Sequence, residues 1–300
     1  MVKPIRIASR KSKLALWQAN TVGKMLATEY EIIEICTTGD KRKDTPIFEL
    51  GGVGVFAKEI QNAVLDGEAD IAVHSAKDLM AITPQGLTLS SIPIRGDVRD
   101  ILIGCNLNDL PYAAVIGTGA QRRRAQLAML RPDLRFEELR GNIETRISKA
   151  KNFNAIVLAN AAVQRLDIKI DLGEVLSIET MLPQVGQAAL ALEVRSDDQS
   201  AIDMTKAINN LDSYRCVQAE RSFLRTLGGG CSIPCAAYCV ILDSGDLWLR
   251  ALLSEPKGLK SIFVEAKPIW KILAKITMKK YPVFAFWLVI VLRLSAQLPS

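Results

Sequence analysis

The sequence predicts an α/β protein built from two successive α/β units and a smaller α+β unit. Between Pro4 and Leu166, apolar segments of strand length alternate with segments of helical periodicity, which is typical of sheets covered by helices. The alternation restarts near Ala114, and after about Leu211 a helix precedes two consecutive strand-like segments. With 300 residues, the chain is also longer than a single hydrophobic core usually supports.

The first unit is predicted to alternate strands with helices around a glycine-rich loop at residues 51–54. Ser9 or Ser12 would cap its first helix, because a serine hydroxyl accepts a hydrogen bond from a free N–H group of the first turn. The predicted strands lie at residues 4–8, 31–36 and 70–74, and the second helix lies at residues 56–65. We expect a parallel sheet, whose binding sites would lie at the carboxyl ends of its strands.

The second unit repeats this alternation, and the third departs from it. Residues 91–100 are expected to form the crossover between the first two units. The elements predicted in the second unit are strands at residues 115–116 and 155–159 and helices at residues 121–130 and 161–166. The third unit is predicted to hold a helix at residues 214–226 and strands at residues 235–242 and 247–253.

The charge of the chain favours an anionic partner. The formal net charge is +6, and 49% of the residues are hydrophobic, as in a folded protein. One stretch holds seven arginines: Arg122, Arg123, Arg124, Arg131, Arg135, Arg140 and Arg146. Leucines interleave with them, which indicates a folded segment and not a disordered basic tail. Composition alone leaves nucleic acid, a membrane surface and a carboxylate-rich small molecule open as partners.

The turn at residues 117–119 and the arginines that follow it predict an anion site. Two glycines open a helix there, and the first N–H groups of a helix can bind an anion. Three arginines in that first turn oppose the helix dipole, and a bound anion would explain this unfavourable arrangement. The alternative for Arg140 and Arg146 is solvated surface arginine. Together with Arg10 and Arg165, they would suit a ligand with several carboxylates.

Lys77 and Asp78 form the only obvious acid–base pair, directly after the strand predicted at residues 70–74. A surface ion pair is the simpler interpretation of these two residues. His74 is the single histidine of the chain and is expected to be structural. A single histidine also excludes most histidine-based triads and histidine-rich metal sites.

Six cysteines are spaced too irregularly for a disulfide framework, which predicts free thiols in a reducing compartment. The first residues carry no apolar signal segment, so we expect a cytoplasmic protein. Cys231 follows three glycines and is predicted to lie on an exposed loop. Its spacing from Cys235 and Cys239 invites a metal interpretation. These two would instead share one face of a strand as buried thiols, so we expect no metal.

Ordered motifs distributed over residues 5–255 resemble those of a known enzyme family. The most specific are RIASRKS at residues 6–12, DIAVHSAKD at 70–78, RGN at 140–142, VGQ at 185–187 and GGCSIP at 229–234. Together they resemble the porphobilinogen deaminase (hydroxymethylbilane synthase) family. The resemblance implies two α/β domains like those of periplasmic binding proteins, hinged over a cleft, and a smaller α+β C-terminal domain. The implied domains are residues 1–93 with 189–206, residues 98–184, and residues 211–300.

The resemblance also implies the reaction and its residues. Four porphobilinogen units would be deaminated and joined on a dipyrromethane primer, and hydrolysis would then release the tetrapyrrole. Cys231 would carry this primer through a thioether, with Lys77, Arg122, Arg123 and Ser12 as further cofactor-binding residues. Asp78 would be the catalytic carboxylate and Lys77 its neighbour. The substrate-binding residues would be Arg10, Arg140, Arg146 and Arg165.

Several positions depart from the family pattern and weaken the expected primer site in detail. Val53 stands where many members have a lysine, and Gly119-Ala120 replaces a common Ser-Ser pair. Gly228 replaces a frequent glutamate, and Lys13 replaces a usual proline. The principal catalytic positions are all present. We therefore expect that replacing Arg122, Arg123 or Arg140 with leucine blocks primer assembly or chain extension and leaves the fold intact.

Two other classes of function compete with this one. A two-lobed solute receptor would share the lobes and the arginines, but it would not need Lys77-Asp78 or the Gly-Gly-Cys motif. A nucleic-acid-binding protein would interleave exposed aromatic residues with its arginines, and none are found. We expect a monomer that binds the small molecule porphobilinogen and neither nucleic acid nor a membrane.

The C-terminal segment does not follow the family, whose closing helix is not recognisable beyond about residue 255. Residues 283–292 form an unbroken apolar run of ten residues, about half the length needed to span a membrane. This run is uncharged and free of proline, which is typical of aggregation-prone segments. We expect an aberrant, poorly packed C-terminus.

Overall fold

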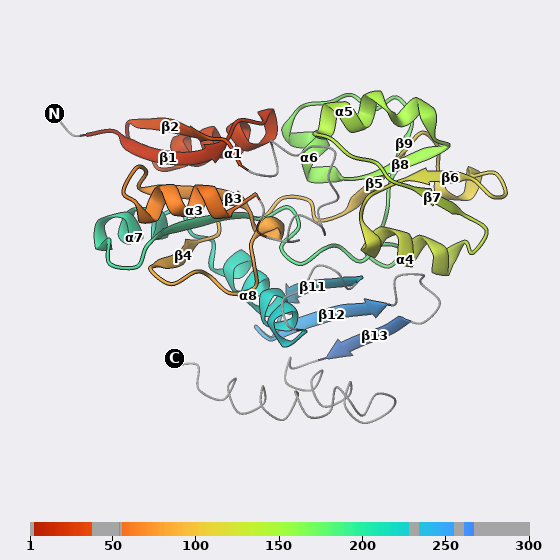
Figure 1. The fold of residues 1–300 in the computed structure, drawn as a ribbon. Coiled ribbons are helices and arrows are strands. Elements are labelled where there is room, and N and C mark those ends of the chain that lie inside the picture. Colours follow the sequence, from red (N-terminus) through yellow and green to blue (C-terminus); the bar gives the residue numbers. More distant parts are fainter. Residues whose placement is uncertain (1–2, 38–53, 55, 228–233, 255–260, 267–300) are drawn as a thin grey trace.

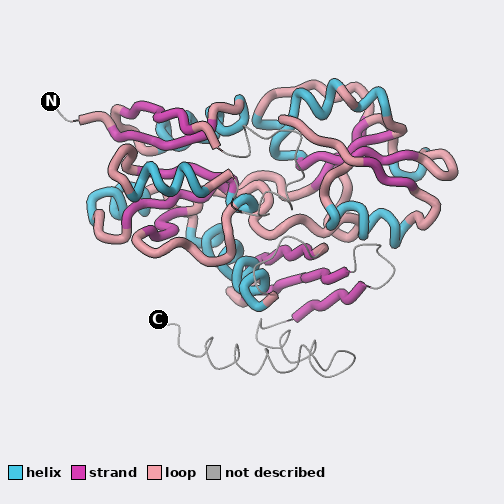
Figure 2. The backbone as a smooth tube through the Cα atoms, in the orientation of Figure 1, coloured by secondary structure: helices cyan, strands magenta, loops and turns pink. Residues whose placement is uncertain are grey.

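The computed structural model describes residues 3–37, 54, 56–227 and 234–254, together with the backbone of 261–266. Two α/β lobes lie side by side, and a third unit lies beneath their junction (Figures 1 and 2). Each lobe contains a five-stranded sheet, and the third unit contains a three-stranded one. This arrangement confirms the predicted fold class of two α/β units followed by a smaller α+β unit.

The first lobe holds a mixed sheet with the strand order β2-β1-β3-β10-β4. Its strands are β1 (Ile5–Arg10), β2 (Tyr30–Ile35), β3 (Ile71–Ser75), β4 (Leu87–Ser91) and β10 (Leu190–Arg195). β1 pairs parallel with β2 and β3, but β10 runs antiparallel to both β3 and β4. The expectation of a fully parallel sheet is therefore wrong. β10 enters this sheet only after the chain has passed through the second lobe, and it arrives from the opposite direction.

The helices of the first lobe are α1 (Lys13–Met25), α3 (Lys58–Leu65) and α7 (Gln199–Lys206). Ser12 caps α1, because its hydroxyl oxygen accepts a hydrogen bond of 3.3 Å from the Ala15 N–H group. Ser9 instead donates its hydroxyl to the carbonyl oxygen of Ala15. The choice left open between the two serines is thus resolved in favour of Ser12.

The second lobe repeats this topology with the strand order β7-β6-β8-β5-β9. Its strands are β5 (Asp100–Ile103), β6 (Val115–Gly117), β7 (Arg135–Glu137), β8 (Ala155–Ala159) and β9 (Gly173–Val175). β6 pairs parallel with β7 and β8, and β5 is antiparallel to β8 and β9. Its helices are α4 (Gln121–Leu130), α5 (Ile143–Ser148) and α6 (Asn160–Arg165). The chain enters this lobe between β4 and β5, within the segment predicted as a crossover.

The third unit packs a long helix, α8 (Leu211–Thr226), against an antiparallel sheet. The strands of this sheet are β11 (Cys235–Ile241), β12 (Leu247–Ser254) and β13 (Ser261–Ala266). Phe223 and Leu224 of α8 share one buried cluster with Ala237 and Leu249 of the sheet. Because this cluster also takes in Val185, the third unit is joined to the segment that leads back into the first lobe.

Several predicted features lie outside the described residues. They are Cys231, most of the loop at residues 51–54 with Val53, Gly228, and the apolar run at residues 283–292. Within the part of the chain that the structure describes, no helix is both long and apolar enough to cross a membrane.

Candidate active site

Lys77 and Asp78 lie on a single 3₁₀ turn, η1 (Ala76–Asp78), at the carboxyl end of β3. The Ala76 N–H group donates to the Ala189 carbonyl oxygen at 2.9 Å, which fixes the start of the turn. Gly186 lies against the same turn with a φ of +70°, and a Cβ atom there would lie 3.1 Å from the backbone nitrogen of Lys77. A glycine is therefore required both for its backbone angle and for this close approach.

The charges around Lys77 come from both lobes. Burial lowers its pKa to about 8, and Arg123 and Arg122 of the second lobe act in the same direction. Asp78 and Asp100 act in the opposite direction. Within the described residues, neither Lys77 nor Asp78 forms an ion pair, so the simpler interpretation as a surface ion pair is not supported. The Asp78 carboxylate is half-buried and has no cation in contact with it among those residues.

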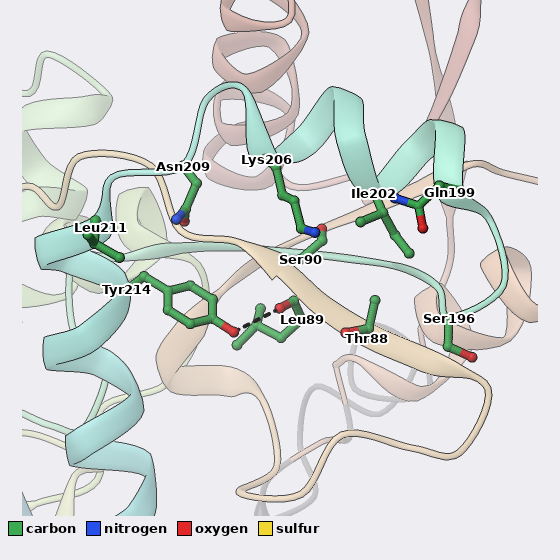
Figure 3. A pocket seen from close by; sticks show the side chains of 10 residues that line it. All are labelled: Thr88, Leu89, Ser90, Ser196, Gln199, Ile202, Lys206, Asn209, Leu211 and Tyr214. Atoms are coloured by element: carbon green, nitrogen blue, oxygen red, sulfur yellow. Dashed lines mark hydrogen bonds between the residues drawn. The ribbon is translucent and has the colours of Figure 1, made fainter. Parts of the chain in front are cut away.

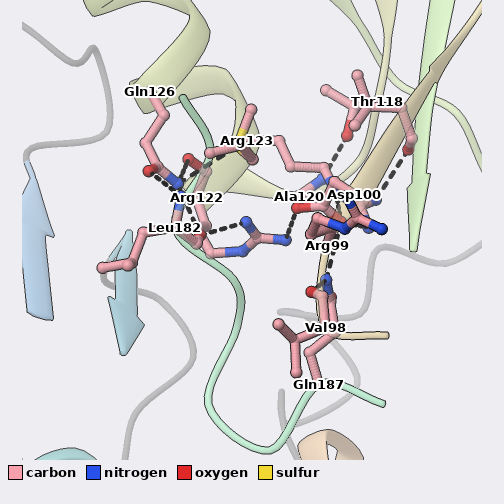
Figure 4. Close-up of polar contacts among 12 residues, drawn as sticks. Val98, Arg99, Asp100, Thr118, Ala120, Arg122, Arg123, Gln126, Leu182 and Gln187 are labelled. Carbon is pink, nitrogen blue, oxygen red and sulfur yellow. Dashed lines mark hydrogen bonds and ion pairs between the residues drawn. The ribbon is translucent and has the colours of Figure 1, made fainter. Parts of the chain in front are cut away.

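Arg122 and Arg123 turn from the start of α4 into the protein, where both contact Asp100 (Figure 4). Asp100 is fully buried at the start of β5. An oxygen of its carboxylate lies 2.7 Å from Nη2 of Arg122, and the other lies 2.8 Å from Nη2 of Arg123. Burial alone would raise the pKa of Asp100, but the two guanidinium groups hold it below its usual range.

This arrangement changes what the arginines were expected to do. Arg122 and Arg123 are about 95% buried and donate to the carbonyl oxygens of Leu182 and Val157, at 2.6 and 2.8 Å. Removing either one would leave a buried carboxylate short of a partner. The expectation that leucine at these two positions spares the fold therefore conflicts with this geometry.

The turn before α4 uses its own polar groups. The Thr118 N–H group donates to the Glu137 carbonyl oxygen, and the Ala120 N–H group donates to the Thr118 hydroxyl. Arg124 turns back and donates to the Thr118 carbonyl oxygen at 2.7 Å. Fewer N–H groups are therefore free for an anion than the glycines suggested. The arginines also oppose the helix dipole less than expected, because Asp100 and Glu138 pair with them.

Buried donors nevertheless remain for a ligand. The Nε and Nη2 atoms of Arg122 make no hydrogen bond within the described part of the chain, although both are buried. The contact of Nη2 with Asp100 is close but poorly aligned for a hydrogen bond. One carboxylate also faces two guanidinium groups, so a net positive charge remains. These features suit a carboxylate of an anionic group such as the dipyrromethane that the resemblance implies.

A second group of arginines surrounds Glu138, directly after β7. Its carboxylate lies 2.8 Å from Nη2 of Arg124 and 3.0 Å from Nε of Arg140. Arg146 donates its Nε to the Gly141 carbonyl oxygen at 2.8 Å. Burial lowers the pKa of Arg146 to about 10, and Arg123 and Arg140 add to this effect. Asp78 and Glu138 oppose it. Arg146 therefore lies within electrostatic range of both the Asp78 turn and Glu138.

Two further predicted residues, Arg10 and Arg165, each stack on an aromatic ring. The Arg10 guanidinium stacks over Phe56, with its central carbon 4.0 Å from the ring centre. Arg165 of α6 donates to the Ala188 carbonyl oxygen at 2.6 Å and lies over the ring of Trp17 in α1, 5.4 Å from its centre. Burial lowers the pKa of Arg165 to about 10.

The structure thus brings some predicted residues together and leaves others apart. Lys77, Asp78, Arg122, Arg123 and Arg146 form one electrostatically connected group across the two lobes. Arg140 joins this group through its effect on Arg146. Ser12, Arg10 and Arg165 lie on neighbouring elements and have local contacts of their own. Cys231 lies outside the described residues.

Sequence reasoning missed two buried acids with central roles. Asp100 appeared only as the end of a crossover, with no sign that it pairs with arginines. Glu220 of α8 was given no role. Its carboxylate accepts hydrogen bonds from Arg95 at 2.6 and 3.1 Å, from the Gly186 N–H group at 2.8 Å and from the Cys239 N–H group at 3.0 Å. It thus joins the third unit to the segment that supports Lys77.

Gln187, the last residue of the VGQ motif, was also given no role. Its side-chain amide donates to the Val98 carbonyl oxygen at 2.6 Å and to Asp100 at 3.0 Å (Figure 4). The two segments that connect the lobes are therefore bonded to each other next to the buried arginine pair. The presence of VGQ among the family motifs was the only signal that could have pointed to it.

His74 and two of the cysteines have structural environments, as expected. The His74 Nε2 atom lies 3.3 Å from the buried carboxylate of Glu193, which also accepts a hydrogen bond from Gln61 at 2.7 Å. Burial raises the pKa of the Cys235 thiol to about 11, and Cys239 packs in the core of the third unit. Among the described residues, no cluster of three or more metal-ligating side chains occurs.

A cavity of about 650 Å³ lies between β4, α7 and the start of α8 (Figure 3). It is lined by Thr88, Leu89, Ser90, Ser196, Gln199, Ile202, Lys206, Asn209, Leu211 and Tyr214. The Tyr214 hydroxyl donates to the Leu89 carbonyl oxygen at 3.3 Å. None of the predicted site residues lines this cavity, so it is not part of the candidate active site.

Comparison with known proteins gives matches over most of the chain. Residues 5–203 match the family model "Porphobilinogen deaminase, dipyromethane cofactor binding domain", and residues 214–272 match "Porphobilinogen deaminase, C-terminal domain". A porphobilinogen deaminase of Syntrophomonas wolfei is 43% identical over 267 residues, which cover 86% of this chain and 87% of the relative. One of Brevibacillus brevis is 40% identical over 263 residues, covering 84% of this chain and 85% of the relative.

Solved structures show more distant likenesses. An ancestral cationic amino acid solute binding protein is 14% identical with a TM-score of 0.41, over 75% of this chain and 91% of that chain. An arginine-specific periplasmic binding protein of Salmonella typhimurium is 12% identical with a TM-score of 0.39, over 74% of this chain and 98% of that one.

Proposed function

The chain belongs to the porphobilinogen deaminase family, and on this premise we propose that it acts as a hydroxymethylbilane synthase. It deaminates porphobilinogen, joins four units head to tail on a dipyrromethane primer, and releases the linear tetrapyrrole by hydrolysis. The observation that carries this proposal is that the Lys77–Asp78 turn of the first lobe lies within electrostatic range of the arginine pair of the second lobe. Asp78 lies beside Lys77 on one side, and Lys77 is within electrostatic range of the buried Arg122 and Arg123 on the other.

The proposed holding of the cofactor rests on the residues present. Cys231 would form the thioether, and Arg122 would offer its buried Nε atom to a cofactor carboxylate, since its Nη2 atom already contacts Asp100. Arg123, Lys77 and Ser12 would add a second guanidinium, an ammonium and a hydroxyl donor. When bound, the dipyrromethane supplies the pyrrole carbon to which substrate units are joined.

Asp78 is proposed to act on the pyrrole nitrogen of the substrate. Loss of ammonia from porphobilinogen leaves positive charge on that nitrogen, and a nearby carboxylate stabilises such charge. The same carboxylate can accept and return a proton as each new bond forms. The lack of a competing cation in contact with Asp78 among the described residues keeps it available for this role.

Four further arginines are proposed to hold the carboxylates of substrate and growing chain: Arg10, Arg140, Arg146 and Arg165. Arg146 supports this most directly, because it is half-buried and lies within electrostatic range of both Asp78 and Arg123. A solute receptor remains a poorer proposal, because the family match extends through the C-terminal domain as well as both lobes.

We further propose that the enzyme is a cytoplasmic monomer with the three domains given above. The five cysteines within the described residues are all free, in keeping with a reducing compartment. Residues 92–99, which join β4 to β5, and Glu220 would then lie at the junctions between the domains.

The proposal is tested by the intact mass of the purified protein. Protein made in cells with a working pathway should be heavier than its sequence by about two pyrrole units. Cys231→Ala should lack this excess, whereas Cys235→Ala should keep it, because Cys235 is a largely buried thiol with a raised pKa. A wild-type protein of bare mass that also fails to consume porphobilinogen would contradict the proposal.

A further inference from the structure

We propose that Glu138 is an internal carboxylate that occupies an arginine subsite beside the candidate active site. A carboxylate of the substrate or of the growing chain would displace Glu138 from this subsite. Glu138 would thereby set how tightly the enzyme holds its anionic ligands. This inference rests on the proposed function, since it concerns the carboxylates of porphobilinogen and its oligomers. It assigns a specificity role to a residue that no motif of the sequence singled out.

The geometry at Glu138 is that of a bound carboxylate. Its two oxygens face different arginines, with Oε2 at 2.8 Å from Nη2 of Arg124 and Oε1 at 3.0 Å from Nε of Arg140. Arg124 and Arg140 also lie on separate segments, one in α4 and one after β7. Two guanidinium groups from different segments around one carboxylate form the arrangement that recognises a ligand carboxylate.

Gly119 makes room for this carboxylate. A Cβ atom at position 119 would lie only 2.6 Å from Oε1 of Glu138 and 3.4 Å from its carboxyl carbon. Any larger side chain there would push the carboxylate away from its present position. Gly119-Ala120 replaces the Ser-Ser pair common in the family, so this chain has lost two neutral hydroxyl donors. A negatively charged acceptor stands beside the vacated space.

Glu138 also belongs to the electrostatic surroundings of the candidate active site. The charges of Glu138, Arg140, Arg123 and Asp78 all affect the pKa of Arg146, so all four lie within electrostatic range of one guanidinium group. The Glu138 side chain is 45% exposed, which leaves it able to move aside when a ligand arrives. A ligand carboxylate can bind Arg124 and Arg140 fully only after Glu138 releases them.

This exchange lowers the net gain on binding, because breaking the two ion pairs of Glu138 offsets the formation of new ones by the ligand. The negative charge of Glu138 also repels an anionic ligand that binds nearby. Both effects weaken the hold on porphobilinogen and on the growing chain, and both favour release of the anionic product. Salt screens interactions between exposed charges, so the influence of Glu138 should shrink as ionic strength rises.

The test compares Glu138→Gln with Glu137→Gln in the holoenzyme. Both variants remove one exposed negative charge from adjacent positions, but within the described residues only Glu138 pairs with an arginine. We expect Glu138→Gln to lower the KM for porphobilinogen roughly three- to tenfold at low salt, as expected for two half-exposed ion pairs. Glu137→Gln should leave KM unchanged. At high salt, the two variants should converge.

A second readout does not depend on steady-state turnover or on product release. After limited addition of porphobilinogen, intact-mass spectra should show a larger fraction of Glu138→Gln carrying additional pyrrole units than of Glu137→Gln. Gly119→Ser provides an independent variant, because its Cβ would displace the Glu138 carboxylate. It should lower KM in the same direction, and its effect should not add to that of Glu138→Gln.

The outcomes separate this inference from the proposed function. A wild-type enzyme that does not consume porphobilinogen contradicts the proposed function itself. With an active wild type, a KM for Glu138→Gln that equals that of Glu137→Gln would overturn the inference. A raised KM would do the same, because it would show that Glu138 positions the arginines for the ligand instead of competing with it.

Discussion

Asp100 determines the arrangement of the arginine pair at the level of single residues. It is fully buried, and it accepts from Arg123 and from the Gln187 amide while also contacting Arg122. The guanidinium groups are consequently held in place before any ligand arrives. Such preorganisation reduces the entropy lost when a ligand carboxylate binds. A buried acid of this kind supports binding although it need not touch the ligand.

The first residue-level prediction concerns that pairing. Arg123→Leu should destabilise the protein by up to about 3–5 kcal/mol, the usual cost of removing one partner of a buried ion pair, although Arg122 would still contact Asp100. Denaturant unfolding measures this loss. Arg131→Leu at the end of the same helix removes a partly exposed pair with Asp133 and longer bonds to the Leu110 and Pro111 carbonyl oxygens, and it should change stability far less. If Arg123→Leu unfolds like wild type, the contact with Asp100 contributes little. Adding Asp100→Asn should deepen the loss, because it would leave the buried Arg122 guanidinium without its carboxylate.

Asp78→Asn should reduce turnover by at least ~10²-fold, the usual scale for one positioned acid–base group. The amide keeps the shape of the side chain but cannot neutralise positive charge on a pyrrole nitrogen. Steady-state rates measure the loss, and intact mass shows whether the primer is still attached. Asp97→Asn is a suitable control, because Asp97 pairs with Arg99 on the connecting segment. Near-normal turnover in Asp78→Asn would contradict the assigned role.

The lowered pKa of Lys77 predicts a pH dependence of binding. As pH rises through about 8, Lys77 loses its positive charge, so the KM for the anionic substrate should rise. Lys77→Arg keeps its charge and should move this rise to higher pH. Unfolding cannot produce the same trend. A folded pKa below 10.5 means that the unfolded chain binds more protons between pH 8 and 10.5, and this group then favours folding more as pH increases. Identical KM profiles would contradict the prediction.

At the scale of elements, local pattern predicted some segments fully and others only in part. The predicted helix at residues 121–130 and strand at residues 155–159 match α4 and β8 residue for residue. Proline after the helix and a run of five apolar residues in the strand mark these limits clearly. The direction of β10 could not be predicted this way. It depends on where the chain re-enters a sheet whose other strands are far away in sequence.

The position of a site residue was predictable where a motif follows a strand. It was not predictable where contacts between distant segments determine the direction of the side chain. Lys77 and Asp78 follow a strand and lie where parallel-strand geometry places them. The inward turn of Arg122 and Arg123 was not foreseeable, because Asp100 lies 22 residues before Arg122 at the start of a strand. Its partners are set by the packing of β5 beside β8. Glu138 is one of two adjacent glutamates, and sequence alone does not show which of them faces the arginines.

At the scale of the whole molecule, Glu220 connects the third unit to both segments that join the lobes. Its bonds to Arg95, Gly186 and Cys239 join a connecting segment, the support of the Lys77 turn and the sheet of the third unit. The third unit carries the Gly-Gly-Cys motif, so Glu220 also links the unit of the proposed cofactor attachment to the turn that holds Lys77 and Asp78. A buried carboxylate that accepts four hydrogen bonds makes this junction strongly dependent on one residue.

Two contacts between α1 and the second lobe hold the lobes together, and one of them is particular to this chain. Lys13 at the start of α1 lies 3.3 Å from Glu144 of α5, and its position is usually a proline in the family. Arg165 of α6 stacks on Trp17, one turn further along α1. The Lys13–Glu144 pair therefore adds an attraction between the two lobes.

Charge reversal tests whether this pair acts on the separation of the lobes. Lys13→Glu and Glu144→Lys should each repel the opposite lobe and lower kcat/KM by no more than about fivefold, as expected for an exposed ion pair. The double exchange restores the attraction and should recover activity. Small-angle scattering should show larger radii of gyration for the single variants only.

The matched control is the Lys11–Glu34 pair, which has similar exposure but lies within the first lobe. Reversing Lys11 and Glu34 in the same way should change neither activity nor radius. Equal losses in the two sets would indicate a general effect of surface charge and would contradict a role for Lys13 and Glu144 in lobe closure.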